Sequence, residues 1–117
     1  MQNYKKLMAW EESHKLVLCL YRVTKLFPKD ERFGITSQLR RSAVSVPANI
    51  AEGCGRYTTN DTARFFQIAL GSLHESEYYI LLAKDLNYIT EIEFNNLTIL
   101  LNNVKAMLLS LIKKMRT

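Results

Sequence analysis

The chain has 117 residues, of which 48% are hydrophobic and 23% charged, with only four glycines and two prolines. This length suits a single domain over residues 1–117, and the composition excludes a disordered or collagen-like chain. The formal net charge of +5 favours polyanionic partners such as nucleic acid, although the same charge also serves solubility.

The first half of the chain predicts two helices, over about residues 7–27 and 32–55. Pro28 ends the first, and Gly53 and Gly55 stand where the second should stop. Each helix carries one cysteine, Cys19 and Cys54. These two cysteines form no CxxC pair and are expected to be reduced.

The second half predicts two more helices, over about residues 60–87 and 91–115. Thr58 to Asp61 offer caps for the third helix, and Thr90 with Glu93 fits a capping box at the start of the fourth. The expected core columns are Phe66, Ala69, Leu73, Ser76, Ile80 and Ala83 on the third helix, and Leu97, Leu100, Val104, Leu108, Leu111 and Met115 on the fourth. Four helices with short connections predict an all-α fold, an antiparallel up-down-up-down four-helix bundle.

A polar stripe runs along one face of the second helix. Its residues at helical spacing are Gln38, Arg41, Ser45, Asn49, Glu52 and Arg56. We interpret Gln38, Ser45, Asn49 and Glu52, together with Glu75 of the third helix, as a structural polar network, with Arg56 as the partner of Glu52 one turn away. The functional alternative is that Arg40, Arg41 and Arg56 present donors to phosphates.

No pattern for catalysis or a resident metal is found. Glu11 and His14 have the Glu-x-x-His spacing of a di-iron half-site, but the only other histidine, His74, follows Gly71 at that spacing. Ser42 and Ser45 lack a nearby pattern of histidine and acid, Cys54 has no obvious base, and no phosphate-binding glycine loop is present. We therefore expect no catalytic residues, no metal and no cofactor, and a protein that is not an enzyme.

The expected location and assembly follow from two further patterns. No uncharged apolar run approaches the ~20 residues that cross a bilayer, and the first residues lack a secretion signal, so we expect a cytoplasmic protein with no membrane partner. The apolar faces of the helices are wider than one bundle can bury, which predicts a homo-oligomer.

The chain resembles a bacterial family in the order of its motifs. The shared elements are Trp10 to His14, Tyr21, Phe27-Pro28, Gln38 to Arg41, Ser45 to Gly53, Arg56, and Ala69 to Glu75. The family is that of the "four helix bundle proteins", also called 23S ribosomal RNA intervening-sequence proteins, and the resemblance covers about residues 7–111. Cys54 stands where an aromatic or apolar residue is common.

The resemblance implies an antiparallel bundle that assembles into a five-fold ring. It also implies kinship in fold with the accessory variability determinant of diversity-generating retroelements, a basic pentamer that works with a reverse transcriptase and nucleic acid. Carried over, it makes Arg40, Arg41 and Arg56 candidates for a basic surface and leaves Asn49, Glu52 and Glu75 as structural residues.

Two hypotheses for function remain open. The first is a non-enzymatic oligomer, a pentamer on the resemblance, that binds structured RNA or DNA. Its candidate contacts are Arg40, Arg41, Arg56, Lys105, Lys113, Lys114 and Arg116. The second is a protein-interaction adaptor or scaffold, in which a protein is the partner and the arginines serve subunit assembly.

Overall fold

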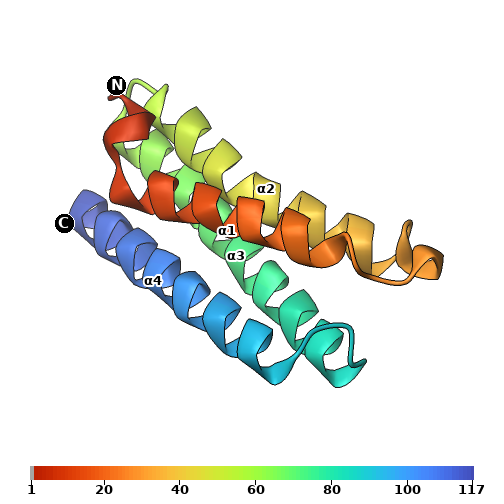
Figure 1. Ribbon diagram of the computed structural model, residues 1–117. Helices are drawn as coiled ribbons and strands as arrows, with labels where there is room; N and C mark the ends of the chain where they lie inside the picture. Colours follow the sequence, from red (N-terminus) through yellow and green to blue (C-terminus); the bar gives the residue numbers. More distant parts are fainter. Residues whose placement is uncertain (1) are drawn as a thin grey trace.

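The structure, a computed structural model, describes residues 2–117 and is built on four long helices (Figure 1). They are α1 (Met8–Thr24), α2 (Ile35–Cys54), α3 (Thr59–Asp85) and α4 (Glu91–Arg116). Two 3-10 turns, η1 (Tyr4–Lys6) and η2 (Lys29–Glu31), precede α1 and α2. Successive helices run in opposite directions, and the two termini lie at the same end. The fold is therefore the predicted all-α, up-down-up-down four-helix bundle.

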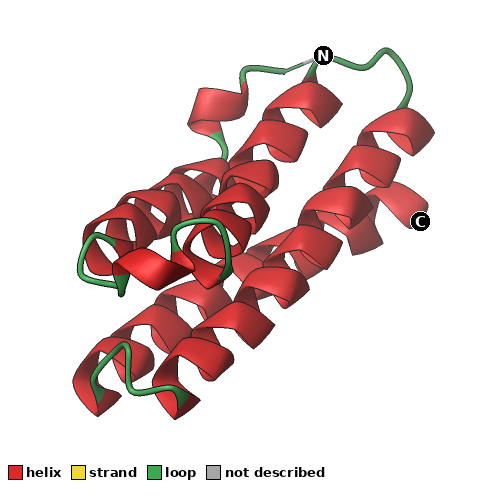
Figure 2. Ribbon diagram, turned by 90° about the vertical axis from the view of Figure 1, so that its right-hand side faces the viewer, coloured by secondary structure: helices red, strands yellow, loops and turns green. Residues whose placement is uncertain are grey.

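The connections between the helices are short, and residues 2–117 contain no strand (Figure 2). Each helix packs on two neighbours: α1 on α2 and α4, and α3 on the same two. The pairing of α2 with α3 is the most extensive. No helix within residues 2–117 combines the length and the apolarity needed to cross a membrane.

Threonines cap the amino-terminal ends of α3 and α4, and both are among the cap residues that the sequence offers. Thr58 Oγ1 accepts from the backbone N–H of Asp61 at 3.1 Å. At α4, Thr90 Oγ1 accepts from the N–H of Glu93 at 3.1 Å, and Glu93 Oε1 accepts from the N–H of Thr90 at 2.8 Å. The predicted capping box is confirmed, and each bond satisfies a donor that the helix itself cannot pair.

The connection between α1 and α2 is longer than the sequence predicts. α1 ends at Thr24, because the N–H of Phe27 bonds the carbonyl of Thr24 in a tighter, 3-10 type turn. α2 begins only at Ile35, because the η2 turn intervenes and the N–H of Gly34 bonds the carbonyl of Glu31 at 2.9 Å. The expected ends at residues 27 and 32 are therefore corrected to residues 24 and 35.

α3 ends at Asp85, close to the expected residue 87. Asn87 takes a φ of 63°, a left-handed conformation that stops the helix and that asparagine tolerates well.

The core is centred on α3. All six residues of its expected column are buried, and Phe66 is completely so. On α4 the column is shifted: the buried residues are Leu97, Leu101, Val104, Leu108 and Ile112. Leu100, Leu111 and Met115, expected in the core, are only partly buried at its edge. The apolar stripe of α4 is wide enough to offer both columns, and the angle at which α4 meets α1 and α3 selects one.

Candidate nucleic-acid interface

A polar seam joins α2 to α3. The hydroxyls of Ser42 and Ser76 are 2.8 Å apart, and those of Ser45 and Ser72 are 2.9 Å apart. Asn49 Nδ2 donates to the carbonyl and to the hydroxyl of Ser45, at 2.8 and 2.9 Å. Serines pair across the helices because their side chains are short enough for the backbones to approach closely. The seam therefore contains Ser45 and Asn49 of the predicted polar network.

A groove opens along this seam on the surface. Its volume is about 390 Å³, and its lining is Gln38, Arg41, Ser42, Ser45, Ser72 and Glu75. Arg41, Gln38 and Glu75 are exposed there, and Glu75 accepts a hydrogen bond from Tyr79 at 3.3 Å. Glu52 is separate: its Oε1 accepts from Arg56 Nη2 at 2.7 Å. The expected Glu52–Arg56 pair is confirmed, but it does not join the groove.

Several of the candidate phosphate contacts bind other parts of the bundle instead of pointing freely to solvent. Arg40 Nε donates to Thr24 Oγ1 at 2.8 Å, and its guanidinium lies 4.6 Å from the ring centre of Tyr21. Lys105 donates to both oxygens of Glu77, at 3.1 and 3.2 Å. Arg40 thus fastens α2 to α1, and Lys105 fastens α4 to α3.

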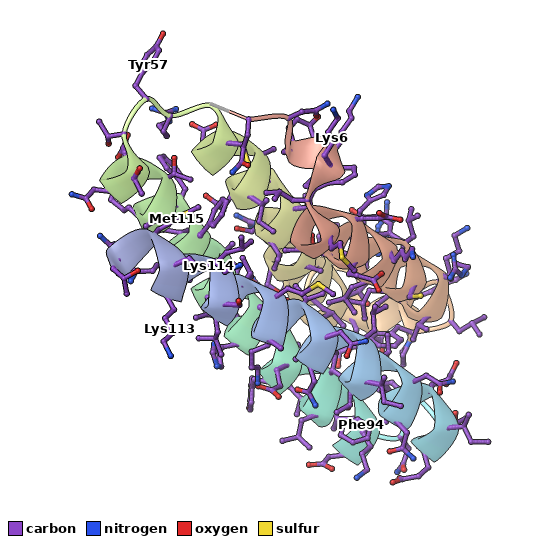
Figure 3. The ribbon with its side chains drawn as sticks, turned by 90° about the vertical axis from the view of Figure 1, so that its left-hand side faces the viewer. Lys6, Tyr57, Phe94, Lys113, Lys114 and Met115 are labelled. Atoms are coloured by element: carbon purple, nitrogen blue, oxygen red, sulfur yellow. The ribbon has the colours of Figure 1, made fainter. Side chains whose placement is uncertain are left out.

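Lys113 and Lys114 are exposed at the carboxyl end of α4 (Figure 3). Arg116 Nη2 donates to Gln67 Oε1 of α3 at 3.1 Å and is otherwise exposed. Lys6 and the turn between α2 and α3 lie at the same end of the bundle. The backbone N–H of Gln2 bonds the carbonyl of Cys54 at 3.1 Å, which holds the amino-terminal segment against that turn.

We call this end of the molecule the basic end. It is defined by seven cationic residues: Lys5, Lys6, Arg56, Arg64, Lys113, Lys114 and Arg116. Within residues 2–117, only Arg56 and Arg64 of this set have an acidic partner within 4.0 Å, namely Glu52 and Asp61. Exposed ion pairs of this kind contribute little stability, so each arginine can readily exchange its carboxylate partner for another anion.

The opposite end of the bundle carries both signs of charge. Its connections hold Lys25, Lys29, Arg32 and Lys84 together with Asp30, Glu31, Asp85, Glu91 and Glu93. The positive field of the molecule is therefore concentrated at the basic end, where it attracts anions most strongly.

Sequence reasoning missed three members of the basic end, Lys5, Lys6 and Arg64. The adjacent pair Lys5-Lys6 is visible in the sequence, but nothing local places it beside α4. The guanidinium of Arg64 lies 4.5 Å from the ring centre of Phe65, and that of Arg56 lies 4.9 Å from the same centre. That stacking arrangement depends on the turn between α2 and α3 and has no sequence signature.

A cavity of about 230 Å³ lies at the basic end. It is lined by Gln2, Cys54, Arg56, Tyr57, Thr58, Thr59, Thr62 and Met115. Burial raises the pKa of the Cys54 thiol, so this group stays protonated at neutral pH and is a poor nucleophile. No group of three or more metal-ligating side chains gathers anywhere in the described part of the chain. The lining supplies hydroxyls and a guanidinium, which are groups that bind anions.

Comparison with known proteins agrees with this fold. The family model described as "23S rRNA-intervening sequence protein" matches residues 5–110. A solved structure from Bacteroides thetaiotaomicron VPI-5482, a protein of unknown function from the S23 ribosomal protein family, is 25% identical in sequence. The match covers 91% of this chain and 99% of that one, with a TM-score of 0.84. No match was found among curated proteins.

Proposed function

This chain belongs to the 23S rRNA-intervening sequence protein family, and from that premise we propose that it binds structured RNA or another nucleic acid at its basic end. The protein acts without catalysis, as a homo-oligomer, which the family resemblance implies is a pentamer. Binding is mainly electrostatic, through contacts with phosphates.

The observation that carries this proposal is the convergence of three distant segments. The η1 turn, the turn between α2 and α3, and the last turns of α4 bring their cations to one end of the bundle. Lys113 and Lys114 are exposed there and have no acidic partner within 4.0 Å in residues 2–117. Ammonium groups in this state can neutralise phosphates without first breaking an ion pair inside the protein.

The proposal also redistributes the roles of the predicted residues. Lys113, Lys114, Arg116 and Arg56 are its phosphate contacts, joined by Lys5, Lys6 and Arg64. Arg40 and Lys105 serve the packing of the helices. Arg41, in the groove of the polar seam, lies apart from the basic end and has no part in this binding site.

We test the proposal with the double variant Lys113→Gln plus Lys114→Gln. Binding of an RNA hairpin is measured by fluorescence anisotropy over a series of salt concentrations. The wild-type affinity should fall linearly with salt on logarithmic axes. The variant slope should be smaller by about two, because two phosphates are no longer neutralised by a lysine.

The matched control is Lys25→Gln plus Lys29→Gln, which removes the same charge at the opposite end. These lysines are exposed like Lys113 and Lys114. If the control lowers the slope as much as the test variant, net charge alone attracts RNA and the basic end is not the site. If the wild type binds neither RNA nor duplex DNA at low salt, the nucleic-acid function is rejected.

The second candidate, a protein-interaction adaptor, is favoured by a separate observation at the opposite end. Leu26 and Phe33, on either side of the η2 turn, are 82% and 87% exposed. Two protruding apolar side chains so close in sequence favour contact with another protein surface, either that of a different protein or that of a second copy of this chain. Purified protein that carries no nucleic acid and retains a specific protein in a pull-down would support this candidate over the first.

A further inference from the structure

Tyr57 is the most exposed of the large hydrophobic side chains at the basic end. It belongs to the turn between α2 and α3, its residue is 90% exposed, and Figure 3 shows its ring projecting away from the bundle. A ring in this position buries almost no apolar surface within the chain, so it does not contribute to the core. Large exposed aromatic rings gain most when a flat partner covers them.

The residues around Tyr57 hold cations in fixed positions. The guanidiniums of Arg56 and Arg64 both lie against the ring of Phe65, at 4.9 and 4.5 Å from its centre. Arg56 Nε is buried and has no hydrogen-bond partner, while Nη2 of the same group bonds Glu52. Stacking on Phe65 restricts the rotamers of the arginines, so less conformational entropy is lost when they bind an anion.

The cavity of the basic end adjoins this arrangement directly. Tyr57 and Arg56 both line it, together with the hydroxyl-bearing Thr58, Thr59 and Thr62. Two of these hydroxyls have partners within the chain: Thr58 caps α3, and Thr62 donates to the carbonyl of Gly53 at 2.9 Å. Tyr57 thus presents a flat ring beside a hollow that holds a guanidinium and hydroxyls, and these groups match the three parts of a nucleotide: base, phosphate and sugar.

We propose that this site takes one unpaired nucleotide of RNA, whose base stacks on Tyr57 and whose phosphate faces Arg56. The proposal rests on the proposed function, in which Lys113 and Lys114 contact other phosphates of the same RNA. It adds a preference for loops, bulges or single-stranded ends, because a base inside a duplex has both faces covered by its neighbours. Stacking of this kind accepts any base, so sequence specificity is not expected from it.

Two RNA probes of equal stem length test the inference. One is a hairpin with 2-aminopurine in its loop, and the other is a blunt duplex. Tyr57→Ala should weaken binding of the hairpin by about tenfold and leave the duplex unchanged. Tyr57→Phe, which keeps the aromatic ring, should bind the hairpin like the wild type. Quenching of the 2-aminopurine by the wild type and by Tyr57→Phe, but not by Tyr57→Ala, reports the stacking directly.

The salt series separates this inference from the function on which it rests. Tyr57→Ala changes no charge, so the slope of affinity against salt on logarithmic axes should stay at the wild-type value. The alanine variant should also fold normally, because the side chain is 90% exposed. Thermal unfolding checks this expectation.

Each remaining outcome rejects either the stacking site alone or both proposals. If Tyr57→Ala binds the hairpin as the wild type does, or weakens both probes equally, the stacking site is rejected and the proposed function stands. If the variant changes the molar mass in light scattering, Tyr57 is a subunit contact and the stacking site is likewise rejected. If the wild type binds neither probe at any salt concentration, both proposals are rejected.

Discussion

Tyr88 is the residue through which two distant connections meet. Its hydroxyl donates to Glu31 Oε2 at 2.8 Å, and its ring lies 5.4 Å from that of Phe27, centre to centre. Residues 31 and 88 belong to the α1–α2 and α3–α4 connections, so this contact closes the end of the bundle opposite the basic end. The hydrogen bond to Glu31, aided by burial, raises the pKa of Tyr88 above its ordinary value.

The raised pKa of Tyr88 predicts how stability depends on pH. The folded pKa is above the unfolded value of about 10, so the stabilisation is complete below about pH 10 and is lost as pH rises through the folded pKa. The free energy of unfolding of the wild type should therefore exceed that of Tyr88→Phe by a constant amount between about pH 8 and about pH 9, and should approach it as pH rises above about 10. Urea denaturation at each pH measures the difference. A difference between the wild type and Tyr88→Phe that stays constant over the whole range would contradict the role of the bond.

The pairing of α2 with α3 depends on small residues at the contact. Besides the paired serines, Gly53 lies so close to α3 that a Cβ on it would be 3.0 Å from Phe66 Cε1 and 3.1 Å from Phe65 Cβ. Phe66 is fully buried and cannot move aside easily. Gly71, within α3, is different, because a Cβ there meets nothing within 4 Å. Gly53 is therefore needed for the close packing of α2 on α3, whereas Gly71 only leaves α3 with a residue that is unfavourable in a helix.

Alanine substitutions at these glycines should change stability in opposite directions. Gly53→Ala overpacks the contact and should lower the free energy of unfolding by about 1–3 kcal/mol. Gly71→Ala should raise it by about 0.5–1 kcal/mol, because glycine is unfavourable inside a helix. Denaturant titration of both variants measures the two effects. Equal stabilisation by both would show that α2 and α3 can separate at no cost, contrary to their close packing.

At the scale of the whole molecule, the two ends of the bundle differ in chemistry. One end gathers cations, and the other has mixed charges with exposed apolar side chains such as Phe33. A bundle of 43 × 24 × 20 Å with both features suits an assembly in which the apolar end is covered and the basic end stays accessible.

This difference predicts which substitution disturbs assembly. Light scattering of the wild type at micromolar concentration should give several times the mass of one chain, and Phe33→Asp should reduce it. Tyr57→Asp is the matched control, since it adds the same charge at a ring of similar exposure, 90% against 87% for Phe33. The control should leave the mass unchanged. A monomeric wild type would reject the oligomer altogether.

Prediction from the sequence succeeded best for features that depend on the residues of a single helix. The buried column of α3 and the caps at Thr58 and Thr90 follow from periodicity and local hydrogen bonding alone. On α4, periodicity allowed two columns, and packing chose Leu101 and Ile112 over neighbours such as Leu100. The start of α2 was misplaced because the preceding residues form a 3-10 turn, which has a weak pattern in sequence.

The sequence by itself determined four helices, their order, their caps and the Glu52–Arg56 pair, because all of these depend on residues within one or two turns of each other. Only the tertiary structure decided which cationic side chains bind a neighbouring helix and which have no acidic partner. Arg40 and Lys105 met Thr24 and Glu77 on neighbouring helices, whereas Lys113 and Lys114 did not meet an acid within residues 2–117. Whether a long charged side chain is bound or free depends on which helices become neighbours, and that follows from burial of the whole apolar surface rather than from any local pattern.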